Sequence, residues 1–344
     1  MNAMHTAKPD LLHPARNLQT APSSWFKIAA LVIAAAALVI WTSPPVALVS
    51  GILFSLLIGH PFAHWNHRVI KWLLQICVVL LGFSMDLPVV LRLGLNGSLF
   101  AAASIGATLI LGVWLGRKLS LERKTSILIS AATAICGGSA VAAVSTVIGA
   151  TEAEIAVSIG TVFLLNAAAL YLFPLTGHLL HLSQTQFGLW AGIAIHDISS
   201  VVGAGLSYGQ TALATATAVK LSRTLWIVPL TLAMAFNMGR NRHLFRAAHS
   251  GQAHKTKIAI PWFIGFFLLA SLMRSYIPAV TDWAPEISQI ARRGMILVLF
   301  LIGTSLSLRA LKVVGWRTMA VGIALWLFIS ISSLSAIYFF HLGS

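Results

Sequence analysis

Long apolar runs alternate with short polar connections along almost the whole sequence. Most runs have about the 20 residues that an α-helix needs to cross the hydrocarbon core of a bilayer. Ten-residue segments of alternating hydrophobicity, which are typical of membrane β-barrels, are missing from the sequence. The pattern therefore predicts an all-α polytopic membrane protein.

The lengths of the apolar runs, and the Gly, Pro and charged residues between them, predict about eleven transmembrane helices. The expected crossings are 25–42, 45–59, 68–84, 98–116, 125–148, 153–176, 187–205, 211–236, 258–276, 287–307 and 318–340. The second crossing is short, and "SPPV" before it could be a kink inside one helix, so ten crossings is the alternative. Residues 1–24 are expected to form a polar cytoplasmic tail, and residues 25–344 a single transmembrane domain.

Composition and charge agree with a membrane protein and exclude a soluble domain. Hydrophobic residues make up 58% of the chain, charged residues only 9%, and the mean hydropathy is +0.88. The net charge of +15 comes from Lys and Arg residues that gather in alternate connections, above all in "GRKLSLERK" and "GRNRHLFRAAHSGQAHKTK". Cytoplasmic loops of membrane proteins keep such an excess. The distribution predicts a cytoplasmic N-terminus and an external C-terminus, and it explains the charge without nucleic acid.

The two cysteines, Cys77 and Cys136, both lie inside apolar segments. Their positions support neither a disulfide framework nor a zinc site with the usual ligand spacing. A nucleotide-binding motif such as a P-loop is also missing, so ATP-driven pumping by this chain is not expected. We therefore expect no metal ion and no other cofactor.

Two pairs of similar segments raise the question of an internal repeat. "VLLGFSMDL", which ends the third expected crossing, matches "FLIGTSLSL" in the tenth, and these two helices are expected to run in opposite directions. "AICGGSAV", from Ala134, matches "AIHDISSV", from Ala194, but those two helices are expected to run the same way. The two members of each pair are also separated by different numbers of residues, so one repeat unit cannot contain both pairs. An inverted repeat and a chance similarity between small-residue segments therefore both stay open.

Ionisable residues occur inside the seventh expected crossing, where each costs about 2.5 to 3.5 kcal/mol on insertion scales. His196 and Asp197 fall near the membrane midplane. In a continuous helix His196 shares one face with Ser199 and Ser200. Such groups need partners, water or a ligand. Asn166, in the sixth expected crossing, is interpreted as a hydrogen-bonding residue between helices.

The eighth expected crossing carries two cations in the segment "ATAVKLSRTL". Thr217, Lys220, Arg223 and Thr224 fall within one polar stripe of this helix. A buried ion pair with Asp197 could simply fix the helix packing, or Arg223 could extend to the cytoplasmic interface. Asp197 neutralises only one cation, however, so the group keeps about one positive charge. This balance favours a bound anion.

The fifth expected crossing contains the small-residue segment "AICGGSA" near its middle. Two adjacent glycines weaken a helix by about 1 kcal/mol each, which predicts a break at Gly137 and Gly138. The second half of a broken helix would then direct its backbone N–H groups toward the membrane centre, close to Cys136 and Ser139, and such an end binds anions. The alternative is close helix packing through small residues.

These same stretches resemble a known family of bacterial membrane proteins, the YeiH-type family, which is described as sulfate exporters. The resemblance rests on "LLGFSMDL", "ATAICGGSAVAA", "GIAIHDISSVVGAG", "ATAVKLSR" and "LIGTSLSL", and it covers most of the chain. It implies an inner-membrane secondary transporter related to the cation/proton antiporter and bile-acid symporter group. That group has inverted repeats, broken helices that cross at the substrate site, and an elevator-like movement. The implied substrates are sulfate and related sulfur oxyanions or sulfonates.

Three functions are compatible with these residues. The first is a secondary transporter, an exporter, of a small anion, coupled to H+ or Na+ and with a site at the membrane midplane. The second is a cation/proton antiporter with Asp197 as the carrier. The third is an intramembrane enzyme that uses His196 with Ser199 or Ser200, although no hydrolase or metal motif supports it. The first is favoured, which makes the protein a transporter and not an enzyme.

The predicted site follows from the first of these functions. The expected substrate-binding residues are Lys220, Arg223, Cys136, Gly137, Gly138, Ser139, Ser199, Ser200 and Thr217. His196 and Asp197 are expected to carry a coupling proton or to orient the cations. The expected partners are a small anion, a coupling ion and the lipid bilayer of the inner membrane, and the sequence leaves a homodimer open.

Overall fold

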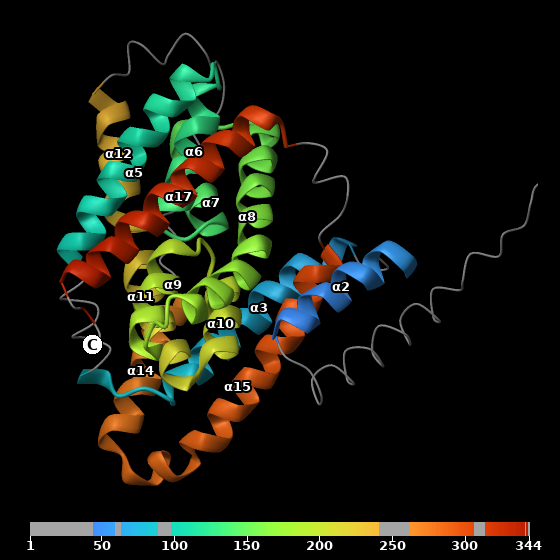
Figure 1. Ribbon diagram of the computed structural model, residues 1–344, viewed down its shortest axis with the longest axis vertical. Helices are drawn as coiled ribbons and strands as arrows, with labels where there is room; N and C mark the ends of the chain where they lie inside the picture. The colour runs from blue at the N-terminus through green and yellow to red at the C-terminus, as the bar shows by residue number, and fades with distance from the viewer. Residues whose placement is uncertain are drawn as a thin grey trace, which may run out of the picture.

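A computed structural model describes residues 44–58, 63–88, 98–240, 262–305, 314–340 and 342 (Figure 1). Within these residues every regular element is a helix, as the apolar pattern predicts. The helices are α2 (Pro44–Ile58), α3 (Ala63–Gly82), α5 (Ser98–Lys118), α6 (Arg123–Ala134), α7 (Gly138–Ile148), α8 (Glu152–Leu179), α9 (Gln184–Ala194), α10 (Ile198–Tyr208), α11 (Gln210–Leu225), α12 (Ile227–Arg240), α14 (Trp262–Tyr276), α15 (Pro278–Ser305) and α17 (Trp316–Phe339).

Several of these helices have the length and composition of membrane spans. In the described part of the chain, five segments are long and apolar enough to cross a bilayer: Phe100–Lys118, Glu152–Leu179, Gln210–Phe236, Pro278–Thr304 and Trp316–Phe339. Shorter apolar helices accompany them. Large apolar side chains such as Leu57, Ile110 and Phe339 are at least 75% exposed, which suits contact with lipid tails. The chain is therefore a multi-pass membrane protein.

Most of the expected crossings coincide with single helices. The crossings expected over 45–59, 68–84, 98–116, 153–176, 258–276, 287–307 and 318–340 correspond to α2, α3, α5, α8, α14, α15 and α17. The crossing expected over 211–236 consists of α11 and α12, which join at Trp226. The crossing expected over 25–42 and the polar tail 1–24 lie outside the described residues.

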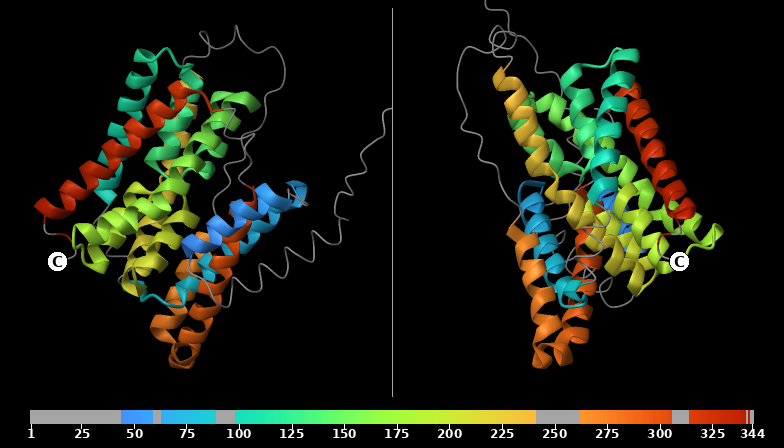
Figure 2. Two further views of the ribbon diagram at one scale, coloured as in Figure 1. Left: turned by 45° about the vertical axis from the view of Figure 1, so that its right-hand side comes forward. Right: turned by 90° about the vertical axis from the view of Figure 1, so that its left-hand side faces the viewer.

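The helices form two groups, which Figure 2 separates. α2, α3, α14 and α15 pack against one another in one group, and α5 to α12 with α17 form the other. In the first group α2 and α15 approach closely through glycines. A Cβ atom added to Gly51 would lie 2.1 Å from the carbonyl oxygen of Phe300, and one added to Gly303 would lie 2.3 Å from that of Leu48. Small residues therefore allow the two backbones to touch.

The segment expected to cross the membrane over 125–148 folds back as a helical hairpin. α6 ends at Ala134, the chain turns at residues 135–137, and α7 returns toward the start of α6. The Nζ atom of Lys124, at the start of α6, donates a 2.7 Å hydrogen bond to the carbonyl of Gly149, just after α7. A straight helix would separate these residues by about 37 Å, at 1.5 Å per residue. We call residues 123–148 the first hairpin and residues 135–137 its tip.

The segment expected to cross over 187–205 also folds back. α9 ends at Ala194, the chain turns at residues 195–197, and α10 returns to the start of α9. The backbone N–H of Thr211 donates to Oε1 of Gln184 at 3.0 Å, and the rings of Phe187 and Tyr208 stack with centroids 3.8 Å apart. We call residues 184–208 the second hairpin and residues 195–197 its tip.

The prediction that both segments cross the membrane is therefore wrong, because non-helical residues at each tip reverse the direction of the chain. The arms of the hairpins have 11 or 12 residues. Such an arm is about 17 Å long, roughly half of a 30 Å hydrocarbon core. Two arms in sequence have the length of one crossing, so apolar length alone does not distinguish a hairpin from a straight helix.

The two hairpins enter the bundle from opposite ends, and their tips meet beside the middle of α8. α8 begins next to the open end of the first hairpin and ends next to the open end of the second (Figure 1). A Cβ atom on Gly137 would lie 3.4 Å from Val162 and 3.5 Å from Cβ of Asp197. The backbone N–H of His196 donates to Asn166 at 3.1 Å. The polar tips therefore meet halfway along a helix of 28 residues.

Candidate functional site

Lys220 and Arg223 hold the carboxyl ends of the first arms of both hairpins. The Nζ atom of Lys220 donates to the carbonyl of Ile195, and Nη2 of Arg223 donates to the carbonyl of Ala134. Nη1 of Arg223 also donates to Oγ of Ser104 at 3.0 Å. Lys220 is 0% exposed and Arg223 1%. Because a helix carries partial negative charge at its carboxyl end, these contacts stabilise both cations without a carboxylate.

α11 reaches both tips because it packs closely along α9. A Cβ atom on Gly188 would lie 2.7 Å from Thr215, and one on Gly192 would lie 2.8 Å from the carbonyl of Ala216. The two helices run side by side to the second tip, where Lys220 meets Ile195. Arg223 is one turn further along α11 and reaches the first tip. One helix thereby fixes the relative position of both tips.

Asp197 is not paired with these cations, so the sequence-based ion pair is not found. Among the described residues the ion pair that forms is Arg274–Asp86, at 2.9 Å. Asp197 instead caps α10: its Oδ1 accepts from the backbone N–H of Ser200 at 3.1 Å, and its Oδ2 accepts from Oγ of Ser199 at 2.5 Å. An aspartate in this position stabilises the positive end of a helix.

His196 lies in the second tip and not on a helical face. The expectation that it shares a face with Ser199 and Ser200 is wrong, because α9 ends at Ala194 and α10 begins at Ile198. Its side chain is fully buried, and neither ring nitrogen has a hydrogen-bond partner among the described residues. A buried imidazole without a partner is costly, so a ligand or a water molecule is the physical explanation to test.

The first tip presents the start of α7 without a side-chain cap. Gly137 is the N-cap residue and has φ 64°, a conformation that favours glycine. A Cβ atom on Gly138 would meet nothing within 4 Å, and Ser139 is exposed. Cys136 is 4% exposed and close to Lys220. The predicted break at the glycines is present, and the backbone N–H of Ala140, in the first turn of α7, is a hydrogen-bond partner of the Cys136 thiol.

Thr217 was predicted to bind substrate, but its hydroxyl forms a hydrogen bond within α11 and not with either tip. Its Oγ1 atom donates to the carbonyl of Leu213 at 2.7 Å, one turn earlier in α11. Thr224, which the stripe also includes, donates in the same way to the carbonyl of Lys220 at 2.8 Å. Both hydroxyls are therefore satisfied within their own helix, which is common for threonine in apolar helices.

The charges and helix ends at the two tips leave a small positive excess. Lys220 and Arg223 contribute two positive charges and Asp197 one negative charge. Each of the two arms that end at a tip adds roughly half a negative charge, and each of the two arms that begin there adds roughly half a positive charge. The helix ends cancel, so the tips retain about one positive charge.

A small pocket lies between the second tip and the other helix group. Asn166, Asp197 and Ser200 line it on one side, and the remaining lining residues are Leu48, Phe163, Ala167, Leu299 and Ile302. Its enclosed space of about 10 Å³ is at the limit for one water molecule. We call it the tip pocket. The sequence-based interpretation of Asn166 as a hydrogen-bonding residue outside its own helix is confirmed by its contact with His196, but its place in the site was not predicted.

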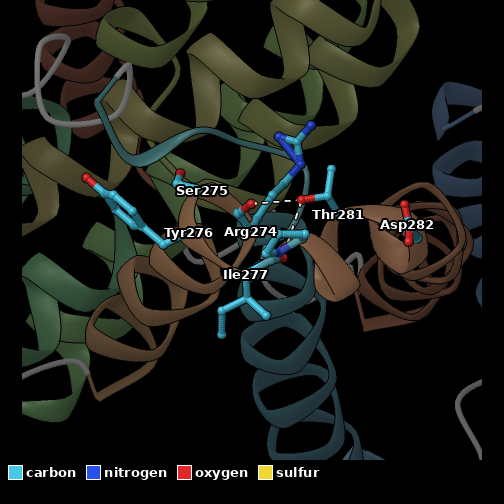
Figure 3. A pocket seen from close by; sticks show the side chains of 7 residues that line it. Arg274, Ser275, Tyr276, Ile277, Thr281 and Asp282 are labelled. Carbon is cyan, nitrogen blue, oxygen red and sulfur yellow. Dashed lines mark hydrogen bonds between the residues drawn. The ribbon is translucent and has the colours of Figure 1, made fainter.

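A larger hollow of about 340 Å³ lies at the turn between α14 and α15 (Figure 3). Its labelled side chains point in different directions: Tyr276 and Asp282 extend to opposite sides, and Arg274 points away from Ile277. Arg274 is also bound to Asp86. Because these polar groups do not converge, this hollow is a weaker candidate than the tips. Across the described residues, no three His, Cys, Asp or Glu side chains come together to hold a metal ion.

Comparisons with known proteins place the chain among bacterial membrane proteins. The family model described as conserved hypothetical protein 698 matches residues 25–322. The chain is 46% identical over 301 residues to a UPF0324 membrane protein of Bacteroides thetaiotaomicron, with 87% of each chain covered. It is 43% identical over 314 residues to one of Bdellovibrio bacteriovorus, covering 90% of this chain and 94% of the relative. No solved structure matches the chain significantly. The protein therefore belongs to the UPF0324, or YeiH-type, family of membrane proteins.

Proposed function

We propose that the protein is a secondary transporter that exports a small anion, such as sulfate or a related sulfur oxyanion or sulfonate. The observation that carries this proposal is the pair of buried cations, Lys220 and Arg223, which hold two hairpin tips and have no carboxylate partner among the described residues. Once the charge of Asp197 is counted and the helix ends cancel, they leave the tips with about one positive charge. A small anion bound between the tips would neutralise it.

The proposed topology has the N-terminus in the cytoplasm and the C-terminus outside, in the inner membrane. Two of the about eleven expected crossings are hairpins, which leaves about nine crossings. The basic segments 116–124 and 239–257 then lie in the cytoplasm, where Lys and Arg accumulate. The first hairpin opens to the cytoplasm and the second to the outside. The two hairpins are thus related as inverted repeats are, because they enter from opposite sides.

Alternating access would require the two helix groups to move relative to each other. The tip pocket lies at their boundary, because Asn166, Asp197 and Ser200 belong to the hairpin group whereas Leu48 and Leu299 belong to α2 and α15. Its present volume is too small for a polyatomic anion. A displacement of the hairpin group along α2 and α15 would open this boundary toward one side of the membrane at a time.

The cation/proton antiporter is less well supported. A cation bound at Asp197 would share the hairpin tips with the buried cations Lys220 and Arg223, and like charges repel. An intramembrane enzyme lacks its central contact, because no hydrogen bond joins His196 to a serine among the described residues. Neither alternative accounts for two unpaired buried cations.

Flux through the purified protein in liposomes tests this proposal. Labelled sulfate, sulfite and a small sulfonate should be offered separately, each with an imposed proton gradient, a sodium gradient or none. We expect at least one anion to move faster than in protein-free liposomes and to respond to a gradient. Sodium or proton exchange that is unaffected by the presence of any of these anions would replace the proposal with the antiporter.

A further inference from the structure

Asn166 lines the tip pocket and has an unused hydrogen-bond donor. It is 2% exposed, it lines the pocket, and its Nδ2 atom has no partner among the described residues. Its Oδ1 atom accepts from the backbone N–H of His196 at 3.1 Å. A backbone N–H donates and cannot accept, so this bond fixes which side of the amide is the oxygen. The NH2 group is therefore the part of Asn166 that remains for a ligand.

Asp197 presents acceptors to the same pocket. Each of its carboxylate oxygens accepts one hydrogen bond, from Ser199 or Ser200, and a carboxylate can accept about four in total. The pocket thus combines an unused donor on Asn166 with unused acceptor capacity on Asp197. A single group that satisfies both must accept one hydrogen bond and donate another.

We infer that the tip pocket receives the hydroxyl group of a protonated, monovalent oxyanion, with Asn166 donating to its oxygen and Asp197 accepting its proton in a hydrogen bond. This inference rests on the proposed function and narrows its substrate class to monovalent oxyanions that keep an O–H group, which leaves out the sulfate dianion and simple sulfonates. A hydroxyl group is the part of a small oxyanion that both accepts and donates. The size of the pocket suits one oxygen atom.

The remainder of the anion would lie toward the first tip. The Cβ position of Gly137, the N-cap residue of α7, is 3.5 Å from Cβ of Asp197, so the start of α7 adjoins a residue that lines the tip pocket. N–H groups at a helix start bind negatively charged oxygens. One negative charge also balances the positive excess of the tips, whereas a dianion exceeds it and offers Asp197 acceptors only.

A bare metal cation fits the pocket less well than a hydroxyl group. Hard cations need oxygen ligands. The amide oxygen of Asn166 is already used by His196, and its NH2 group cannot coordinate a cation. The NH2 group also cannot accept a hydrogen bond from an ammonium group. The polar atoms therefore select for a neutral oxygen that still carries its proton.

Matched anions at one neutral pH test the inference. Bicarbonate and nitrate are both planar and monovalent, but only bicarbonate has an O–H group. Each should be tested as a competitor of tracer anion uptake in proteoliposomes. We expect bicarbonate to compete at least about tenfold better than nitrate, because a site built for a hydroxyl rejects analogues that lack it.

The variant Asp197→Asn supplies the matched control. Asparagine caps a helix as well as aspartate does, so α10 should remain stable. Its amide adds a donor where the carboxylate only accepts, and we expect the preference for bicarbonate over nitrate to fall to about onefold or to reverse. Asn166→Ala should weaken competition by bicarbonate and leave nitrate within about twofold. A thermal unfolding curve of each detergent-solubilised variant checks that it folds.

Equal competition by bicarbonate and nitrate in the unmodified protein would overturn the inference while leaving anion transport intact. An unchanged preference in folded Asp197→Asn would overturn it as well. If no anion moves through the unmodified protein, the proposed function itself fails. The experiment therefore separates the two failures.

Discussion

Replacing Lys220 with methionine should reduce anion flux in proteoliposomes about tenfold or more, since each 1.4 kcal/mol of lost binding is a factor of ten. Methionine keeps the length and apolar stem of the side chain but removes the charge. Lys220 is fully buried and holds the carbonyl of Ile195 at the second tip. The substitution therefore removes one of the two cations and frees the tip.

The same substitution should have a smaller effect on stability. The carbonyl of Ile195 loses a donor, which costs about 1 to 3 kcal/mol, but the burial of a charged ammonium group is no longer required. Lys124→Met is the matched control, because Lys124 also donates to a carbonyl at the first hairpin but is only half-buried. Lys124→Met should retain flux within about twofold. Full flux through folded Lys220→Met protein would show that this cation serves packing alone.

Gly137→Ala should destabilise the first tip, whereas Gly138→Ala should not. Gly137 has φ 64°, and a residue with a Cβ atom held in such a conformation costs about 1 to 3 kcal/mol. Space does not decide the outcome there, because the nearest atoms would be 3.4 to 3.5 Å from the new methyl group. The positive φ angle of Gly137 therefore determines the expected loss of stability. Thermal unfolding in detergent should show a lower midpoint for Gly137→Ala.

Gly138 provides an internal comparison for this effect. A Cβ atom at Gly138 would meet nothing within 4 Å, its φ is ordinary, and it is the first residue of α7. Alanine is the better helix former by about 1 kcal/mol. The unfolding midpoint of Gly138→Ala should therefore equal or exceed that of the unmodified protein. A lower midpoint for Gly138→Ala than for Gly137→Ala would contradict the turn geometry described for the first tip.

Several residues at the tips were predictable from the sequence, because glycine pairs and charged side chains are unfavourable inside an apolar helix. Paired glycines indicated the break at Gly137, and buried charge indicated Lys220 and Arg223. Their partners were not predictable. A carbonyl at the end of a helix leaves no trace in the sequence, so Asp197 was the only visible counter-charge. Asn166 was visible, but nothing in the sequence placed it beside Asp197.

The sequence analysis missed the hairpins because the distribution of Lys and Arg predicts the same side of the membrane for each basic segment with or without them. Replacing two crossings by two hairpins leaves every basic segment on its predicted side, since an even number of crossings is lost. Only the two connections that flank α8 change sides, and residues 149–151 and 180–183 contain neither Lys nor Arg. The distribution of positive charge therefore supported the wrong crossings as well as it supports the observed fold.

The repeated segment contained the information that charge lacked. When Ala134 is aligned with Ala194, the turn at residues 135–137 aligns with the turn at 195–197, and both second arms begin at the same position. The eleven-crossing prediction made these segments run in the same direction. In the structure they enter from opposite ends, and the similarity becomes compatible with an inverted arrangement.

Labelling of single cysteines tests the hairpin topology most directly. Glu122→Cys, Glu152→Cys and Leu180→Cys, each exposed in the structure, should be made in a Cys77→Ser, Cys136→Ser background and treated with a membrane-impermeant maleimide before and after permeabilisation. The hairpins predict that positions 122 and 152 react from the same side of the membrane and that position 180 reacts from the other side. Labelling of positions 122 and 152 from opposite sides would contradict the first hairpin and restore a straight crossing between them.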